Sequence, residues 1–178
     1  MIFAFKWYNL DVAEAILRPP MMTRHVLTGP VIHAECDGYN TCSEMLHDLN
    51  VIPAVECACG IYALKRDVMQ SHEAMEYSRY VPGQQLSWKL VNVLAMIGLY
   101  GRVIEYEVGY RAQHAIIKRL CLLVNGRQYS QWFVSKLEGR YHAPVTQHPL
   151  NALPGDYYSI NRAVRKALPV LLGDMAET

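Results

Sequence analysis

The sequence has almost no excess of charge of either sign. Its 17 Lys and Arg residues stand against 16 Asp and Glu residues, which gives a formal net charge of +1 at pH 7 with histidine counted as neutral. Proteins dedicated to nucleic acids usually carry a basic excess, because neutralisation of phosphates supplies most of their affinity. The composition therefore does not indicate a nucleic-acid partner, although a local basic patch can exist within a neutral total.

A long apolar run is also missing. The most apolar stretch, Leu90 to Gly101, has only about a dozen residues and includes Asn92, whereas a membrane-spanning helix needs roughly 20 apolar residues. The N-terminal segment MIFAFKWYNLDVAEAIL lacks the basic region, apolar run and small-residue cleavage site of a signal peptide. We therefore expect a soluble protein of the cytoplasm with no membrane segment.

Three common motifs of catalysis and cofactor binding do not occur. The sequence contains no phosphate-binding glycine loop, no G-x-S-x-G nucleophile elbow and no H-E-x-x-H metal motif. These absences remove the usual sequence-based reasons to predict an enzyme, and they favour a binding protein.

What is present is typical of a globular domain. Of the 178 residues, 52% are apolar and 19% are charged, which are ordinary values for a folded protein. A chain of this length can bury a core without a disulfide framework. We expect a single domain over residues 1–178, with 170–178 as a flexible tail.

The pattern of β-formers, turn residues and helical stripes predicts an α+β fold, with an antiparallel or barrel-like sheet and three to five peripheral helices. The strands expected are Ile2–Tyr8, Val31–Cys36, Val55–Leu64 and two or three long strands between Trp88 and Val124. Within the long strands, Gly98 and Gly101 predict a kink or bulge. Val108-Gly109 predicts a hairpin turn.

The predicted helices are placed by capping residues and apolar stripes. They cover Asp11–Leu17, a segment from Thr41, Asp67 to about Tyr80, Ser130–Glu138, and a final helix that Ser159 caps. The final helix has its stripe at Ile160, Ala163, Val164, Ala167 and Leu168, and Pro169 is expected to end or kink it. Pro144-Val145 predicts a short extended return, and Thr146–Pro154 predicts a loop.

Four of the five cysteines lie in the first third of the chain. Cys57 and Cys59 are two residues apart on a predicted strand, so their sulfurs share one face. Cys36 and Cys42 precede them, and His33 and His47 are close in sequence. Thiolates with an imidazole are ligands that zinc prefers, and the candidate set is Cys36, Cys57, Cys59 and either Cys42 or His47.

Two other interpretations of the cysteines stay open. Reduced cysteine is among the most buried residue types, so the thiols can be core side chains. A redox or catalytic thiol would need an activating partner, and the sequence identifies none. The odd number of cysteines favours thiols over disulfides.

A second cluster of polar residues lies around the predicted hairpin turn. Glu105 and Glu107 share one strand face, and Arg111 follows just across the turn. Paired carboxylates beside a guanidinium can orient a polar ligand or carry out acid–base chemistry. The alternative is a solvated charge ladder across an antiparallel pair, which is the more frequent pattern. His114 on the next strand is expected to be a core or surface histidine.

Two segments together resemble a known family. They are Cys57-Ala58-Cys59-Gly60-Ile61-Tyr62-Ala63, and Tyr100-Gly101-Arg102-Val103 continuing to Gly109-Tyr110-Arg111-Ala112. They are similar to small uncharacterised proteins encoded by bacteria, notably actinobacteria, and by phages. The resemblance covers roughly residues 30 to 120.

The resemblance implies a zinc site, because in that family a cysteine and a histidine precede the C-x-C-G-I-Y-A run. Cys36 corresponds to the upstream cysteine, but Asn50 stands here at the position of the histidine. His47 or Cys42 would then have to supply the fourth ligand. The family brings no known activity.

Three functions follow as hypotheses. The leading one is a non-catalytic binding or regulatory protein with a structural zinc that docks a tyrosine-rich surface on a protein partner, which would be a host factor if the gene is viral. The second is an enzyme that acts on a nucleotide or small polar substrate through Glu105, Glu107 and Arg111. The third is nucleic-acid binding through a basic patch made of Lys118, Arg119, Arg127, Arg162, Arg165 and Lys166.

Overall fold

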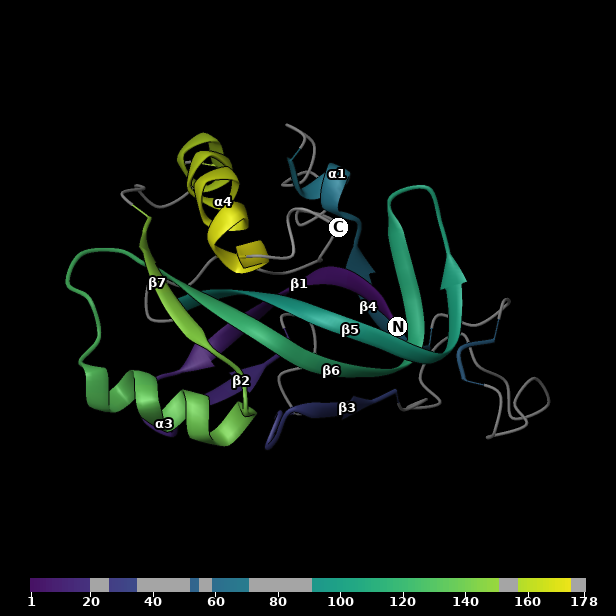
Figure 1. Cartoon of the computed structure of the whole chain (residues 1–178), viewed down its shortest axis with the longest axis horizontal. Helices are drawn as coiled ribbons and strands as arrows, with labels where there is room; N and C mark the ends of the chain where they lie inside the picture. The colour runs from purple at the N-terminus through teal and green to yellow at the C-terminus, as the bar shows by residue number, and fades with distance from the viewer. Residues whose placement is uncertain (20–25, 35–51, 55–58, 71–90, 151–156, 174–178) are drawn as a thin grey trace.

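The computed structural model describes residues 1–19, 26–34, 52–54, 59–70, 91–150 and 157–173, with the backbone alone at 91–92 and 157–161. These residues form an α+β fold with a sheet of seven strands, which confirms the predicted class (Figure 1). The elements in chain order are β1 (Ile2–Asp11), β2 (Ile16–Arg18), β3 (Val31–His33), β4 (Ile61–Leu64), α1 (Arg66–Gln70), β5 (Val91–Glu105), β6 (Gly109–Val124), α3 (Gln131–Tyr141), β7 (Val145–Pro149) and α4 (Tyr157–Leu172).

The hairpin of β5 and β6 is the centre of the sheet. Its turn lies where the sequence predicts it, and the Tyr106 N–H donates to the Gly109 carbonyl over 2.8 Å. The pairing shifts register between Tyr100 and Val103, and Gly101 within this irregularity has φ of 74°. The predicted bulge at Gly101 is confirmed, since glycine adopts this φ without strain. Beyond the bulge the hairpin bends away from the plane of the other strands (Figure 1).

The first strand forms a second hairpin rather than leading into a helix. β1 pairs with β5 from Ile2 to Leu10, and its last residues pair with β2. The helix predicted over Asp11–Leu17 is therefore wrong. Asp11 accepts hydrogen bonds from the Glu14 N–H (3.4 Å) and from the Arg18 guanidinium (3.0 Å), and Ala15 adopts φ of 54°. An aspartate that bonds its own following backbone favours a turn over a helix.

Three short strands follow one another along the outer edge of β6. β4 pairs with its start, β3 with its middle and β7 with its end. The β7 pairing is parallel, unlike the antiparallel sheet predicted, because α3 forms the crossover that returns the chain in the same direction. Residues 145–149, expected in part as a loop, thus belong to the sheet.

β4 also reaches β1, through the single pair Phe5 and Leu64. This pair closes a ring of pairings through β1, β5, β6 and β4. One residue pair is too few to call the sheet a barrel. The other segments predicted as strands, 34–36 and 55–60, adjoin β3 and β4 but mostly lie outside the described residues, as does the predicted helix from Thr41.

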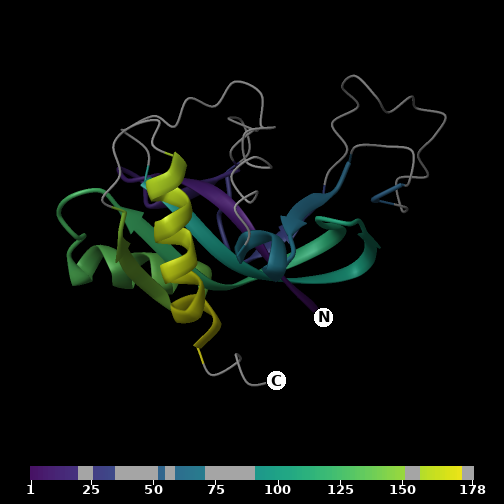
Figure 2. The same cartoon turned by 90° about the horizontal axis from the view of Figure 1, so that it is seen from above.

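Helices cover both faces of the sheet (Figures 1 and 2). On one face, α3 buries the predicted Phe133, Val134 and Leu137, together with Tyr141, and Ser130 caps it by accepting from the Phe133 N–H. On the other face, α4 and α1 cover a separate core. The buried stripe of α4 contains Ala163, Val164, Ala167, Leu168, Leu171 and Leu172.

The final helix differs from expectation at both ends. It begins at Tyr157, two residues before the predicted cap, and it continues through the exposed Pro169 to Leu172. Burial of Leu171 and Leu172 explains the extra turn, since apolar contact offsets the hydrogen bond that proline cannot donate. Three residues of the expected tail are thus helical, and residues 174–178 lie outside the described part.

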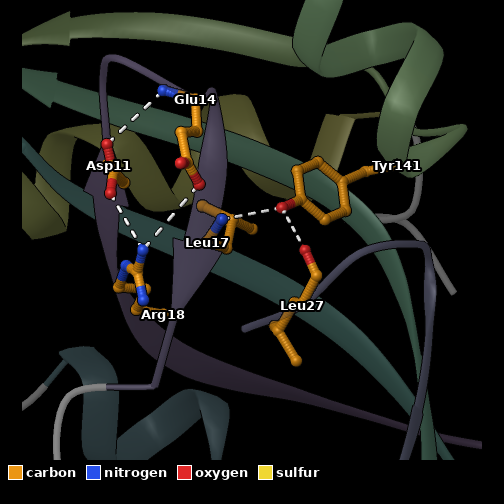
Figure 3. A network of polar contacts seen from close by, with 6 residues as sticks. All are labelled: Asp11, Glu14, Leu17, Arg18, Leu27 and Tyr141. Atoms are coloured by element: carbon orange, nitrogen blue, oxygen red, sulfur yellow. Dashed lines mark hydrogen bonds and ion pairs between the residues drawn. The ribbon is translucent and has the colours of Figure 1, made fainter. Parts of the chain in front are cut away.

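Tyr141 joins α3 to the N-terminal hairpin (Figure 3). Its hydroxyl accepts from the Leu17 N–H over 2.7 Å and donates to the Leu27 carbonyl over 2.7 Å. The ring is fully buried, and burial raises the pKa of the hydroxyl. Both backbone groups are thereby satisfied without water, as buried polar groups require.

Candidate functional site

Of the predicted zinc ligands, the structure describes Cys59 alone. Cys36, Cys42, His47 and Cys57 lie outside the described residues. Cys59 is 8% exposed and packs with Ile52, and Ala34 and Ala54 lie against this pair. The sulfur is therefore placed in a small apolar cluster, apart from the two cores under the helices.

The contacts of Cys59 join three separate stretches of chain. Ala34 continues β3 and stands two residues before Cys36, while Ile52 and Ala54 flank the Pro that follows the 35–51 segment. The Ala34 N–H donates to the Gln113 carbonyl over 2.8 Å, which extends the pairing of β3 with β6. Described residues that adjoin the predicted ligands thus gather in the cluster that contains Cys59.

Among the described residues, no group of three or more His, Cys, Asp and Glu side chains could hold a metal ion. The fifth cysteine, Cys121, is fully buried in the core beneath α4. Burial raises the pKa of its thiol, which is the behaviour of a core side chain. Cys121 therefore fits the interpretation of a reduced cysteine that serves as a core side chain.

The charged residues at the hairpin tip do not converge on one point. Glu105 is cross-strand partner of Tyr110, whereas Arg111 is partner of Ile104, so the carboxylate and the guanidinium leave opposite faces. Glu105 is exposed and pairs with Lys65 over 2.7 Å, and this hydrogen bond raises the pKa of Lys65. Glu107 is exposed in the turn. The described contacts of Arg111 are made elsewhere.

Arg111 contacts the chain on both sides of Cys59 in sequence, at Ala54 and at Gly60. The residue is only 4% exposed, and its guanidinium donates to the Ala54 carbonyl over 2.8 Å. Gly60 has φ of 123°, and a Cβ there would lie 2.5 Å from Cγ of Arg111. The Gly60 backbone can therefore approach the arginine only because it has no side chain.

Two tyrosines on the same face flank this arginine. The ring centroids of Tyr62 and Tyr106 lie 5.9 and 5.5 Å from the guanidinium carbon, within range of a cation–π contact. Both tyrosines are exposed, at 49% and 42%. The sequence pattern did not predict this arrangement; its one local signal is an arginine in a strand that pairs with the Gly60-Ile61-Tyr62 run.

A pair of histidines faces across β3 and β6. His33 and His114 are cross-strand partners, and their Nδ1 atoms are 2.9 Å apart. The rings meet edge to face with centroids 4.9 Å apart, and Tyr100 lies against His114 at 5.1 Å. His33 is exposed and His114 is half-buried. The sequence does not show that these residues meet, because 81 positions separate them.

A half-buried lysine lies where β1 approaches β4. The ammonium of Lys6 donates to the Tyr62 carbonyl over 2.8 Å and lies 5.9 Å from the centre of the Tyr8 ring. Burial lowers the pKa of Lys6 to about 8. Desolvation disfavours the charged form, and this outweighs the hydrogen bond.

The predicted basic residues occupy several elements. Arg127, Arg162 and Lys166 are exposed, and Lys118 and Arg165 are half-buried. The guanidinium of Arg119 lies against Gly173, at the C-terminal end of α4. A cation at this end interacts favourably with the helix dipole, so a structural role accounts for Arg119.

No helix in the described segments is long and apolar enough to cross a membrane. In comparisons with known proteins, no family model matches the chain, and neither a curated protein nor a solved structure matches it significantly.

Proposed function

We propose that this protein is a non-catalytic binding protein in which a structural zinc ion fixes the chain from Cys36 to Cys59, called the thiol segment below. The ligands would be Cys36, Cys57, Cys59 and either Cys42 or His47. The supporting observation is the cluster of Cys59 and Ile52 with Ala34 and Ala54 packed against it, which gathers stretches of chain that adjoin the other proposed ligands.

The small size of this cluster supports the need for a metal. Among the residues that the structure describes, this cluster buries Ile52 and Cys59, whereas each of the two main cores buries a dozen or more side chains. Little hydrocarbon burial means little stabilisation from the hydrophobic effect. Zinc coordination would contribute the missing free energy, since metal binding is coupled to folding of such segments.

The surface beside the thiol segment has the chemistry of a protein interface. Tyr62 and Tyr106 are exposed around the buried Arg111, and tyrosine and arginine are enriched where proteins bind one another. Arg111 also donates to the Ala54 carbonyl, so the same arginine contacts both the thiol segment and the two tyrosines. We propose that this tyrosine surface, defined as Tyr62 and Tyr106, docks on a protein partner.

Elemental analysis of untagged protein, purified without added metal, tests the zinc site. We expect one zinc per chain, and we expect Cys59→Ser and Cys57→Ser to lose it. Cys121→Ser is the matched control, because this cysteine is buried in the other core and should leave the zinc content unchanged. Absence of zinc from the unaltered protein, or equal zinc in all three variants, contradicts the proposal.

The docking surface is tested with the same zinc-loaded protein. Immobilised protein should retain a stoichiometric partner from an extract of its source cells, and the double variant Tyr62→Ser/Tyr106→Ser should not. Trp132→Ser is the control, since Trp132 is 73% exposed on α3 and belongs to another surface. A partner that the double variant retains equally well would exclude the tyrosine surface.

A further inference from the structure

We propose that His33 and His114 form a second metal site, which binds a divalent ion with right-angled coordination, Ni²⁺ or Cu²⁺, through the two facing Nδ1 atoms. Its two ligands are not among those of the proposed zinc site, and the inference does not rest on the proposed function. Histidine is the commonest metal ligand in proteins, and imidazole suits both ions.

The backbone places the two imidazoles before any metal arrives. His33 and His114 are directly opposed on hydrogen-bonded strands, and the Ala34 N–H bond to the Gln113 carbonyl continues that pairing. Ligands on adjacent strands keep their separation, because the sheet resists sliding. The cost of ordering the ligands is thus met in the apo protein.

Neighbouring groups also restrain the orientation of the His114 ring. Tyr100 lies against it at a centroid distance of 5.1 Å, and a Cβ at Gly101 would lie 2.9 Å from its Cδ2 atom. The ring therefore occupies space that only a glycine at position 101 leaves free. His33 is exposed, so an ion can reach the two nitrogens from solvent.

The separation of 2.9 Å between the nitrogens selects the coordination geometry. With metal–nitrogen bonds of about 2.05 Å, two ligands at a right angle are about 2.9 Å apart, and two at a tetrahedral angle are about 3.3 Å apart. The observed spacing matches that of adjacent ligands of a square-planar or octahedral ion, and a turn of the rings aims both lone pairs at the ion. Zinc in tetrahedral geometry would require the rings to separate.

The protons balance without an external base. In the apo pair one Nδ1–H donates to the other Nδ1, so one ring carries its hydrogen on Nδ1 and the other on Nε2. On binding, the first ring moves its hydrogen to Nε2 through solvent, and both Nδ1 lone pairs coordinate the ion. The pair stays neutral and water fills the remaining positions.

Titration of the untagged protein as purified with Ni²⁺, followed by calorimetry, tests the site. We expect one Ni²⁺ per chain, and we expect His33→Gln and His114→Gln each to weaken binding by about tenfold or more, since loss of even an outer-shell partner costs about that much. His148→Gln is the matched control, because this half-buried histidine contacts its neighbouring Pro149 carbonyl and should leave binding unchanged.

Electron paramagnetic resonance of the Cu²⁺-loaded protein gives an independent readout. Coupling to two imidazole nitrogens is expected in the unaltered protein and to one in each variant. Retained Ni²⁺ affinity in both variants overturns the proposal, as does a preference for Zn²⁺ over Ni²⁺ at this site. His33→Gln should keep the zinc of the thiol segment, so failure here is distinguishable from failure of the proposed function.

Discussion

The helix-covered half of the β5–β6 hairpin and its tip are stabilised in different ways. Under α3 and α4 the strands are lined by fully buried apolar residues, of which Leu94, Ile97 and Leu120 are examples. At the tip, polar contacts replace this packing: Arg111 donates to the Ala54 carbonyl, and Lys65 pairs with Glu105. The first half is held by hydrocarbon burial, and the second depends on polar contacts to short segments.

The covered half of the hairpin mainly supplies stability, whereas the tip has the groups that a binding partner could contact. Hydrocarbon packing tolerates little change and leaves no polar atoms for a partner. The tip has exposed tyrosines and titratable groups at its surface, and it adjoins the histidine pair and the thiol segment. Binding residues commonly lie on connecting segments that a rigid scaffold supports. We therefore expect substitutions in the two halves to affect different measurements.

The largest loss of stability is expected from Leu137→Ala in α3. Leu137 is fully buried in the core under this helix. Its truncation should lower the free energy of unfolding by about 2–5 kcal/mol, through lost transfer energy and the cavity left behind. Urea denaturation measures this change. Trp132→Ala on the exposed side of the same helix is the control, and an equal loss there would contradict the division between core and surface.

A smaller loss is expected from Tyr141→Phe, and Tyr8→Phe is its matched control. Removing the Tyr141 hydroxyl leaves the Leu17 N–H and the Leu27 carbonyl unsatisfied, which should cost about 1–3 kcal/mol. The Tyr8 hydroxyl is buried and has no hydrogen-bond partner among the described residues, so its removal should be neutral or stabilising. Thermal denaturation of both variants measures the two changes in stability. Equal losses would contradict a stabilising role for the two hydrogen bonds of Tyr141.

The third effect concerns Lys6 and appears only as a dependence of stability on pH. Its pKa is lowered to about 8 in the folded protein from 10.5 in the unfolded chain. Between these values the unfolded chain binds more protons, so stability rises with pH across this window and the burial penalty is complete below it. Lys6→Met removes the penalty. Relative to the unaltered protein, this variant should lose about 1–3 kcal/mol of its advantage between pH 7.5 and pH 10.5.

Denaturation in urea at several pH values measures the Lys6 difference. Both proteins share every other titrating group, so the change in their difference isolates the lysine. A difference that stays constant from pH 7.5 to pH 10.5 would show that Lys6 is not desolvated in the folded state.

Elements specified by local pattern were predictable. The turn before Gly109, the bulge at Gly101, the Ser130 cap and the apolar stripe of α4 depend on residues near one another in the chain. One exception, the helix expected over Asp11–Leu17, failed because the Arg18 guanidinium and the paired β2 strand favour a turn. An apolar stripe alone cannot distinguish these outcomes.

The sequence by itself determined the α+β class and the central hairpin, because periodicity and turn residues act over a few positions. Only the tertiary structure decided that Arg111 leaves the face opposite Glu105, that β7 runs parallel to β6, and that His33 meets His114. The face of Arg111 and the meeting of the two histidines depend on strand register, because a shift of one residue would reverse every side chain to the other face. The direction of β7 depends on the α3 crossover. Register is set by packing of the whole sheet, which no local stretch of sequence contains.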